Sequence, residues 1–272
     1  MTYETLSVTL EGAIAELRLD RPEKLNPLST RALAELARAA RFLDAQHEVK
    51  VVIVRGAGRA FSAGADLSTF SRASGSRGSS DATGAGPREP TTREAADLGR
   101  EMADAIEGMR PLAIAAIHGW CVGGGLVLAA ACDLRVATED ARFSIPEVDL
   151  GIPLAWGGIP RLVREIGPAR TKELVLTCRP FDAAEALAAG FLNRVVPAAE
   201  LDASVDALAR SLAAKAGHAL FSTKRHVNAV TEQMVGTARS WADADGLVTA
   251  FADEECAAAR RSYLAARSGR AD

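Results

Sequence analysis

Apolar residues follow two different spacings along the first sixty residues, and the change of spacing marks a change from strand to helix. In residues 5–19 apolar side chains alternate with polar ones on either side of Glu11-Gly12, which predicts two half-buried strands joined by a hairpin turn. From residue 30 to residue 46 apolar side chains recur every three or four positions after Ser29, a suitable N-cap, and this predicts a helix. Residues 50–55 (KVVIVR) contain a continuous β-branched run, typical of a strand covered on both faces.

Strand-type and helix-type spacings continue to about residue 200, and beyond that point only the helix-type spacing remains. Helices are predicted over 92–109, 123–131, 158–165, 168–177 and 182–188, and strands over 112–117, 133–137, 143–145 and 191–196. Beyond Leu201 the pattern is almost entirely helical. We therefore expect an α/β core over residues 1–200, with helices outside a stack of sheets, and a helical C-terminal region over residues 201–272.

Residues 71–92 interrupt this pattern with a crowd of serine, glycine and proline. Such a composition buries little apolar surface, so we expect a mobile loop. Two roles fit the segment equally, a lid over a functional site and a tolerated surface insertion.

Charge and cysteine usage exclude several classes of function. The 272 residues carry a net charge of −3 and no basic stripe, which argues against nucleic acid or an anionic membrane as the main partner. The N-terminus shows no signal peptide, and glycines break the most apolar stretch, 112–131, so a membrane span is not expected. The four cysteines form no C-x-x-C pair, which indicates free thiols in a reducing cytoplasm and no metal site.

Two glycine-bearing turns follow two of the predicted buried strands, at residues 56–66 and 118–126. A dinucleotide-binding turn requires G-x-G-x-x-G, but Phe61 occupies the third glycine position, and no Gly-Lys-Ser/Thr follows for a P-loop. Three consecutive glycines, 123–125, remain at the start of a predicted helix. The first N–H groups of a helix lack internal partners and suit a developing negative charge on oxygen, although the glycines could equally serve close helix packing.

Taken with their neighbours, these two turns resemble the crotonase superfamily, and the resemblance runs in order through nearly the whole chain. The matching segments are residues 19–28, 60–67, 116–119, 123–125, 132–135, 143–147, 157–162, 183–187 and 190–192. The resemblance implies a crotonase-like spiral of repeated ββα units with a C-terminal helical region that forms oligomers, as a homotrimer or a dimer of trimers.

By this resemblance, the backbone N–H groups of Ala65 and Gly124 form an oxyanion hole for the thioester oxygen of an acyl-CoA, and Glu147 moves protons. Two positions at which relatives carry further carboxylates hold Val127 and Ala155 here. Coenzyme A would be part of the substrate, so no separate cofactor is expected. The substrate contacts implied by the resemblance, or adjacent to its motifs, are Lys24, Leu25, Ala63, Asp66, Leu67, Gly123, Val127, Pro146, Ala155, Trp156, Phe221 and Lys224.

A single carboxylate favours one reaction over its alternatives. Shifting a double bond needs one base, which takes a proton from C2 and returns it to C4, whereas syn hydration is easiest with two carboxylates. We therefore expect Δ3,Δ2-enoyl-CoA isomerisation with Glu147 as acid and base, its pKa raised by apolar neighbours. Enoyl-CoA hydration and a non-catalytic acyl-CoA-binding protein are the alternatives. Asp149 is a possible second carboxylate, but a solvated turn residue is the favoured interpretation. Trp156 fits either an acyl pocket or core packing.

Overall fold

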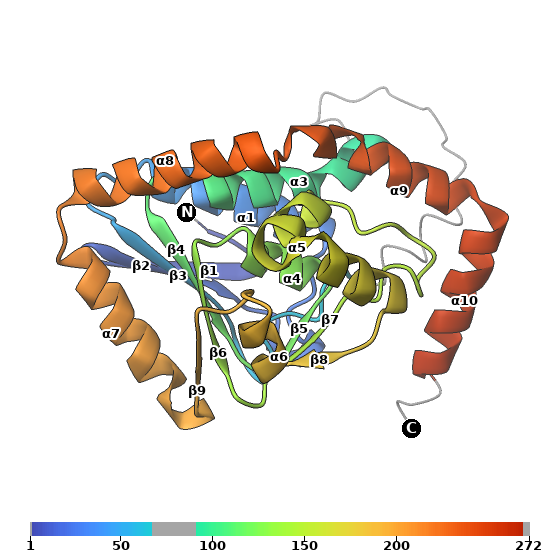
Figure 1. Ribbon diagram of the computed structural model, residues 1–272, viewed down its shortest axis with the longest axis horizontal. Helices are drawn as coiled ribbons and strands as arrows, with labels where there is room; N and C mark the ends of the chain where they lie inside the picture. The colour runs from blue at the N-terminus through green and yellow to red at the C-terminus, as the bar shows by residue number, and fades with distance from the viewer. Residues whose placement is uncertain (1, 67–90, 269–272) are drawn as a thin grey trace.

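The computed structural model describes residues 2–66 and 91–268. Its larger sheet contains six strands. In spatial order these are β1 (Leu6–Glu11), β2 (Ile14–Leu19), β3 (Val51–Gly56), β4 (Leu112–Ile117), β6 (Leu134–Thr138) and β9 (Arg194–Val196). The β1–β2 pair is the predicted antiparallel hairpin, and every later neighbour is parallel. The carboxyl ends of β2, β3, β4, β6 and β9 therefore meet at one edge of the sheet (Figure 1).

A second, small sheet lies beside the large one and contains strands that the apolar spacing did not fully predict. It has the order β5 (Trp120–Val122), β7 (Arg142–Ser144) and β8 (Phe181–Asp182). The β5–β7 pair is parallel and the β7–β8 pair is antiparallel. Only β7 was predicted as a strand, because runs of two or three residues carry no detectable alternation.

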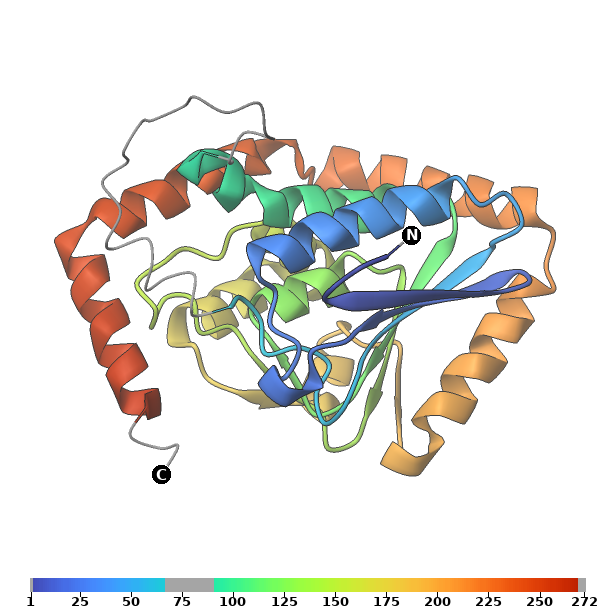
Figure 2. The same cartoon turned by 180° about the vertical axis from the view of Figure 1, so that it is seen from behind.

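Helices cover both faces of the large sheet. The described α-helices are α1 (Thr30–Asp44), α3 (Thr92–Gly108), α4 (Gly124–Ala130), α5 (Gly158–Thr177), α6 (Ala183–Ala188), α7 (Leu201–Ala213), α8 (Gly217–Met234), α9 (Asp243–Ala252) and α10 (Glu254–Ser268). Three 3-10 turns accompany them, η1 (Pro22–Lys24), η2 (Ala198–Glu200) and η3 (Ala238–Ala242). Figure 2 shows α1 and α3 side by side across the sheet, and Figure 1 shows α7 on the opposite side.

Strand β3 shows why the sheet needs helices on both sides. Val52 and Val54 face the main core together with residues of α1 and α3. Val51 and Ile53 face the other way, into a cluster that Leu201, Val205 and Ala209 of α7 complete. Alternate residues of a strand point to opposite faces, so a strand buried on both faces is apolar throughout, as predicted from the run at 50–55.

Two of the predicted helix boundaries are confirmed by their local geometry. The Oγ of Ser29 accepts a hydrogen bond from the backbone N–H of Ala32 at 3.2 Å, which caps α1 as expected. Helix α5 is two helices joined at Gly167, whose φ of 75° is not helical, and this matches the separate predictions over 158–165 and 168–177.

The region from residue 201 to residue 268 is helical, as the sequence indicated. Helix α7 packs on the large sheet, α9 contacts α3, and α10 runs on from α9 toward the C-terminus (Figure 1). A separate unit beginning at residue 201 stays a prediction. The predicted loop over 71–92 lies almost wholly outside the described residues. The choice between a lid and a surface insertion therefore stays open. None of the described helices combines the length and the apolar character that crossing a membrane requires.

Candidate functional site

The turn that follows β2 holds the loop that follows β3. Leu25 and Asn26 both adopt left-handed backbone conformations, with φ of 60° and 54°. The carbonyl oxygen of Leu25 accepts a hydrogen bond from the N–H of Ala63 at 2.8 Å. The buried side-chain amide of Asn26 donates to the carbonyl oxygens of Ala57 and Ala60 at 2.8 and 2.9 Å. Asn26 therefore fixes the path of the glycine-bearing loop, a role that the sequence analysis did not identify.

Ser62 joins this loop to the second glycine-bearing turn. Its Oγ, which is fully buried, donates to the carbonyl oxygen of Asn26 at 2.8 Å and accepts the N–H of Gly64 at 3.1 Å. Its backbone N–H donates to the carbonyl oxygen of Trp120, and its carbonyl oxygen accepts the N–H of Val122, both at 3.0 Å. One residue thus links three segments that are distant in the sequence.

The two backbone N–H groups predicted as oxyanion donors lie on adjoining segments. Gly64 has a φ of 82°, and a Cβ atom added there would lie 3.4 Å from the backbone nitrogen of Gly124 and 2.5 Å from the carbonyl oxygen of Val122. Only glycine fits so close an approach of two backbones. Ala65, the next residue, is therefore a near neighbour of Gly124.

Both of these N–H groups lack a partner within the described residues. Leu28 bonds to the carbonyl of Gly64 and to the N–H of Asp66, so the intervening N–H of Ala65 points away from Leu28. The N–H of Gly124 opens α4, where the first turn of a helix has no internal acceptor. Gly124 is buried and Ala65 is half-buried, and unpaired backbone donors that are withdrawn from water in this way are uncommon and suit a ligand oxygen.

Glu147 lies beside these donors. A Cβ atom on Gly123, the residue before Gly124, would overlap Oε1 of Glu147 and lie 3.2 Å from its carboxyl carbon. The side chain is 8% exposed, and Oε2 has no hydrogen-bond partner within residues 2–66 and 91–268. Removal from water destabilises the charged carboxylate, and this desolvation raises the pKa of Glu147 from 4.5 to about 7.

The other two positions that relatives use for carboxylates are apolar and buried. Val127 on α4 is fully buried, and a Cβ atom on Gly158 would lie 2.9 Å from its Cγ2 atom. Ala155 is 6% exposed. Asp149 is exposed, which agrees with its interpretation as a solvated turn residue. Neither position 127 on α4 nor position 155 therefore offers a second carboxylate.

Pro146, Lys24 and Asp66, three of the predicted substrate contacts, lie on the segments that carry Glu147 or neighbour Ala65. Pro146 is buried beside Glu147, and its carbonyl oxygen accepts the N–H of Leu150 at 3.0 Å in the turn that carries the carboxyl. Lys24 is exposed at the end of η1, next to the Leu25–Ala63 bond, and Asp66 pairs with Arg21 at 3.3 Å. Leu67 lies outside the described residues.

Phe221 and Lys224 are not brought to this place within one chain. The Nζ of Lys224 donates to the carbonyl oxygen of Pro111 at 2.9 Å and to Oδ2 of Asp133 at 2.8 Å. Pro111 and Asp133 precede β4 and β6, so Lys224 lies at the amino-terminal edge of these strands. The Gly123–Gly124 turn instead comes after the carboxyl end of β4, directly after β5. Phe221 lies near the same edge, with the guanidinium of Arg110 4.4 Å from its ring centre.

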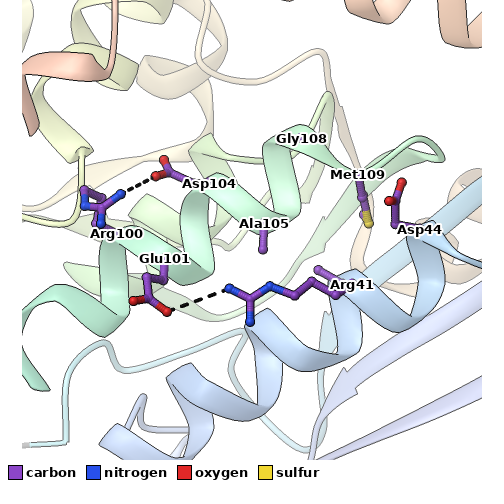
Figure 3. Close-up of a pocket in the computed structure, with 9 residues that line it drawn as sticks. Arg41, Asp44, Arg100, Glu101, Asp104, Ala105, Gly108 and Met109 are labelled. Carbon is purple, nitrogen blue, oxygen red and sulfur yellow. Dashed lines mark hydrogen bonds and ion pairs between the residues drawn. The ribbon is translucent and has the colours of Figure 1, made fainter. Parts of the chain in front are cut away.

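A groove between α1 and α3 is large enough for a ligand, but its side chains are mostly paired with one another (Figure 3). It has a volume of about 380 Å³ and a mostly charged lining. Four of its five charged side chains pair with one another, Arg41 with Glu101 at 3.8 Å and Arg100 with Asp104 at 2.7 Å, and Asp44 accepts the backbone N–H of Arg110 at 2.7 Å. Across the described residues no cluster of His, Cys, Asp or Glu has the arrangement of a metal site.

Comparisons with known proteins place the chain in one family. Residues 9–269 match the family model described as enoyl-CoA hydratase/isomerase. A Mycobacterium tuberculosis protein named as a probable enoyl-CoA hydratase is 34% identical, over 85% of this chain and 84% of its own length. A peroxisomal Delta(3,5)-Delta(2,4)-dienoyl-CoA isomerase from Arabidopsis thaliana is 37% identical, over 82% and 81%.

A solved structure of an enoyl-CoA hydratase from Mycobacterium avium subsp. paratuberculosis superposes with a TM-score of 0.82 at 27% identity. The superposition covers 96% of this chain and 99% of that one. The family model, the curated relatives and the solved structure thus agree on one family. The chain belongs to the enoyl-CoA hydratase/isomerase family, a family of enzymes of the crotonase type.

Proposed function

We propose that this enzyme moves a double bond within an enoyl-CoA thioester, as a Δ3,Δ2-enoyl-CoA isomerase, with Glu147 as its proton carrier. The observation that carries the proposal is one buried carboxyl, without a partner on Oε2 and with a pKa raised to about 7, beside two unpaired backbone N–H groups. A carboxyl with a pKa near neutrality can both remove and return a proton.

The proposed steps follow from the positions of these groups. The thioester oxygen of a 3-enoyl-CoA accepts hydrogen bonds from the N–H groups of Ala65 and Gly124. The Glu147 carboxylate removes a proton from C2, and the electron pair delocalises over the thioester oxygen and the C3–C4 double bond. The same carboxyl, now protonated, delivers that proton to C4, which leaves a double bond between C2 and C3. The two donors stabilise the developing negative charge because they are already oriented toward it.

Hydration of a 2-enoyl-CoA is the second candidate, and the names of most of the similar proteins favour it. Hydration requires a water molecule to be held and deprotonated while a proton is delivered to C2. Val127 and Ala155 offer no carboxylate for the second of these tasks. For this reason we place hydration after isomerisation.

The remaining substrate contacts are part of the same proposal. Coenzyme A lies along the turn of Lys24 and Leu25 and the edge formed by Ala63 and Asp66, and the acyl group lies near Gly123, Val127, Pro146, Ala155 and Trp156. A role for Phe221 or Lys224 at the same chain's coenzyme A would require each to leave the partners described above. A homotrimer or a dimer of trimers in the cytoplasm is the expected setting.

The test compares two reactions on one preparation. Isomerisation of 3-hexenoyl-CoA and hydration of crotonyl-CoA are measured for the wild type, Glu147→Gln and Asp149→Asn. We expect isomerisation in the wild type, its loss in Glu147→Gln, and its retention in Asp149→Asn. Strong hydration without isomerisation would establish the second candidate instead. Tight acyl-CoA binding without turnover of either substrate would identify a binding protein.

A further inference from the structure

Trp156 adopts a backbone conformation that a bulky residue rarely takes. Its φ is 62°, in the left-handed region, and Gly157 follows with a φ of 68°. The surrounding structure holds this turn in place. The N–H of Gly157 donates to Oδ2 of Asp243 at 2.8 Å, and Nη1 of the buried Arg161 donates to the carbonyl oxygens of Trp156 and Gly157 at 3.4 and 3.2 Å. Strained positions of this kind concentrate where side-chain placement serves function.

The indole ring of Trp156 fills a slot that two glycines provide. A Cβ atom on Gly99 of α3 would overlap the indole, and a Cβ atom on Gly124 of α4 would overlap Cζ3 and lie 3.0 Å from Cε3 and Cη2. The ring therefore lies directly against the α-carbons of Gly99 and Gly124. Any larger residue at either position would expel the ring.

This slot adjoins the proposed oxyanion donor. The N–H of Gly124 belongs to the residue whose α-carbon the indole covers, so an oxygen accepting that N–H at about 2.9 Å lies within a few ångströms of the ring. The acyl chain of a bound thioester starts at the carbon that bears this oxygen. Behind the ring lies an apolar cluster that includes Leu150, Ile152 and Leu247. The indole thus separates the space around Gly124 from that cluster.

From this geometry we infer that Trp156 forms the end wall of the acyl pocket and restricts the enzyme to short acyl chains. The inference rests on the proposed function, since it takes Gly124 as a donor to the thioester oxygen. Loss of the indole leaves a space between α3 and α4 that is open to the acyl chain beside Gly124. The two glycines and the apolar cluster line this space. Additional methylenes of a longer chain would enter that space and bury apolar surface there.

The experiment measures chain-length preference in the wild type, Trp156→Phe and Trp156→Ala. The substrates are the butenoyl, hexenoyl and decenoyl thioesters of coenzyme A, and binding of butanoyl-CoA and decanoyl-CoA is measured in parallel by calorimetry. We expect the wild type to prefer the short chains. In Trp156→Ala the decenoyl-to-hexenoyl ratio of kcat/KM should rise by ~10–100-fold, as one or a few buried methylenes would give, with Trp156→Phe between the two.

A matched variant controls for the loss of an indole as such. Trp241 in η3 is 64% exposed, and Trp241→Ala should leave the chain-length profile unchanged. An unchanged profile in Trp156→Ala, in a protein that still unfolds cooperatively, would overturn the inference and leave the proposed function intact. If no enoyl-CoA is converted, the proposed function fails. The calorimetric affinities for decanoyl-CoA and butanoyl-CoA then test the inference. If Trp156 is the end wall, Trp156→Ala binds decanoyl-CoA more tightly relative to butanoyl-CoA than the wild type does, even without turnover.

Discussion

Two carboxyls at opposite edges of the large sheet, the buried Glu147 and the mostly buried Asp133, have opposite surroundings. At the amino-terminal edge, Oδ2 of Asp133 accepts hydrogen bonds from Lys224 Nζ at 2.8 Å and from the N–H of Ala113 at 2.7 Å. Beyond the carboxyl ends of the strands, Oε2 of Glu147 accepts none from the described residues. Burial raises the pKa of both carboxyls, but the Lys224 ammonium opposes that rise only at Asp133.

The difference separates a structural role from a chemical one. A buried charge with a partner and hydrogen bonds holds segments together, and here it joins α8 to β4 and β6. The Oε2 atom of Glu147 joins no segments among the described residues, yet the raised pKa of this carboxyl keeps a proton exchangeable near neutral pH. We therefore expect variants at the two positions to affect different measurements, stability at Asp133 and catalysis at Glu147.

The largest effect is expected on the activity of Glu147→Gln. The amide occupies the same space but cannot take a proton from C2, so kcat for isomerisation should fall by ~100–10,000-fold. The midpoint of urea unfolding should not fall, because no partner of Oε2 is lost. A variant that retains wild-type kcat would show that another group moves the proton.

Asp133→Asn is expected to lower stability and leave kcat nearly unchanged, the opposite of Glu147→Gln. This change leaves the Lys224 ammonium without its charge partner, and removing one member of a buried pair costs ~3–5 kcal/mol of unfolding free energy. Urea unfolding measures that loss, while kcat in the remaining folded protein should stay near the wild-type value. Loss of activity without loss of stability would contradict the division between the two edges.

The pH dependence of stability provides a third way to sharpen the comparison. The folded-state pKa of Glu147, about 7, lies above the unfolded value of 4.5, so the folded protein holds this proton more tightly. Its stabilising contribution is complete below pH 4.5 and is lost as pH rises through 7, a total of ~3 kcal/mol. The difference in unfolding free energy between the wild type and Glu147→Gln should follow this course. A difference independent of pH would mean that the carboxyl is not desolvated.

The smallest effect is expected at Ser62, which acts through the position of Ala65 and Gly124. Ser62→Ala removes the hydroxyl that binds Asn26 and the N–H of Gly64, and a small displacement of the donors should lower kcat by ~10–100-fold with a smaller change in KM. Thr171→Val is a matched control, since the buried Thr171 hydroxyl donates to the carbonyl of Gly167 at 2.8 Å away from the site. Equal losses of kcat in the two variants would indicate a general effect on folding.

Local features of the fold could be predicted from the sequence because neighbouring residues encode them. The hairpin at Glu11-Gly12, the cap at Ser29 and the doubly covered strand β3 each follow from spacing or from one side chain. Strands β5 and β8 were not predicted, since two or three residues form a strand only when a partner strand is present.

In the candidate site too, some residues could be predicted from local motifs and others depend on contacts between distant segments. The glycines at 64 and 123–125 and the carboxyl of Glu147 belong to recognisable motifs, and the structure brings these segments together. The contacts of Asn26 with residues 57–61 and the position of Lys224 depend on segments distant in the sequence, which no local pattern encodes. The left-handed turn at Trp156 likewise depends on Arg161 and Asp243.

The most direct measurement is a crystal structure of the enzyme with a bound acyl-CoA. We expect the thioester oxygen to lie ~2.7–3.1 Å from the backbone nitrogens of both Ala65 and Gly124, with C2 facing the Glu147 carboxyl. A thioester oxygen bound elsewhere, or a C2 atom out of reach of Glu147, would contradict the proposed chemistry.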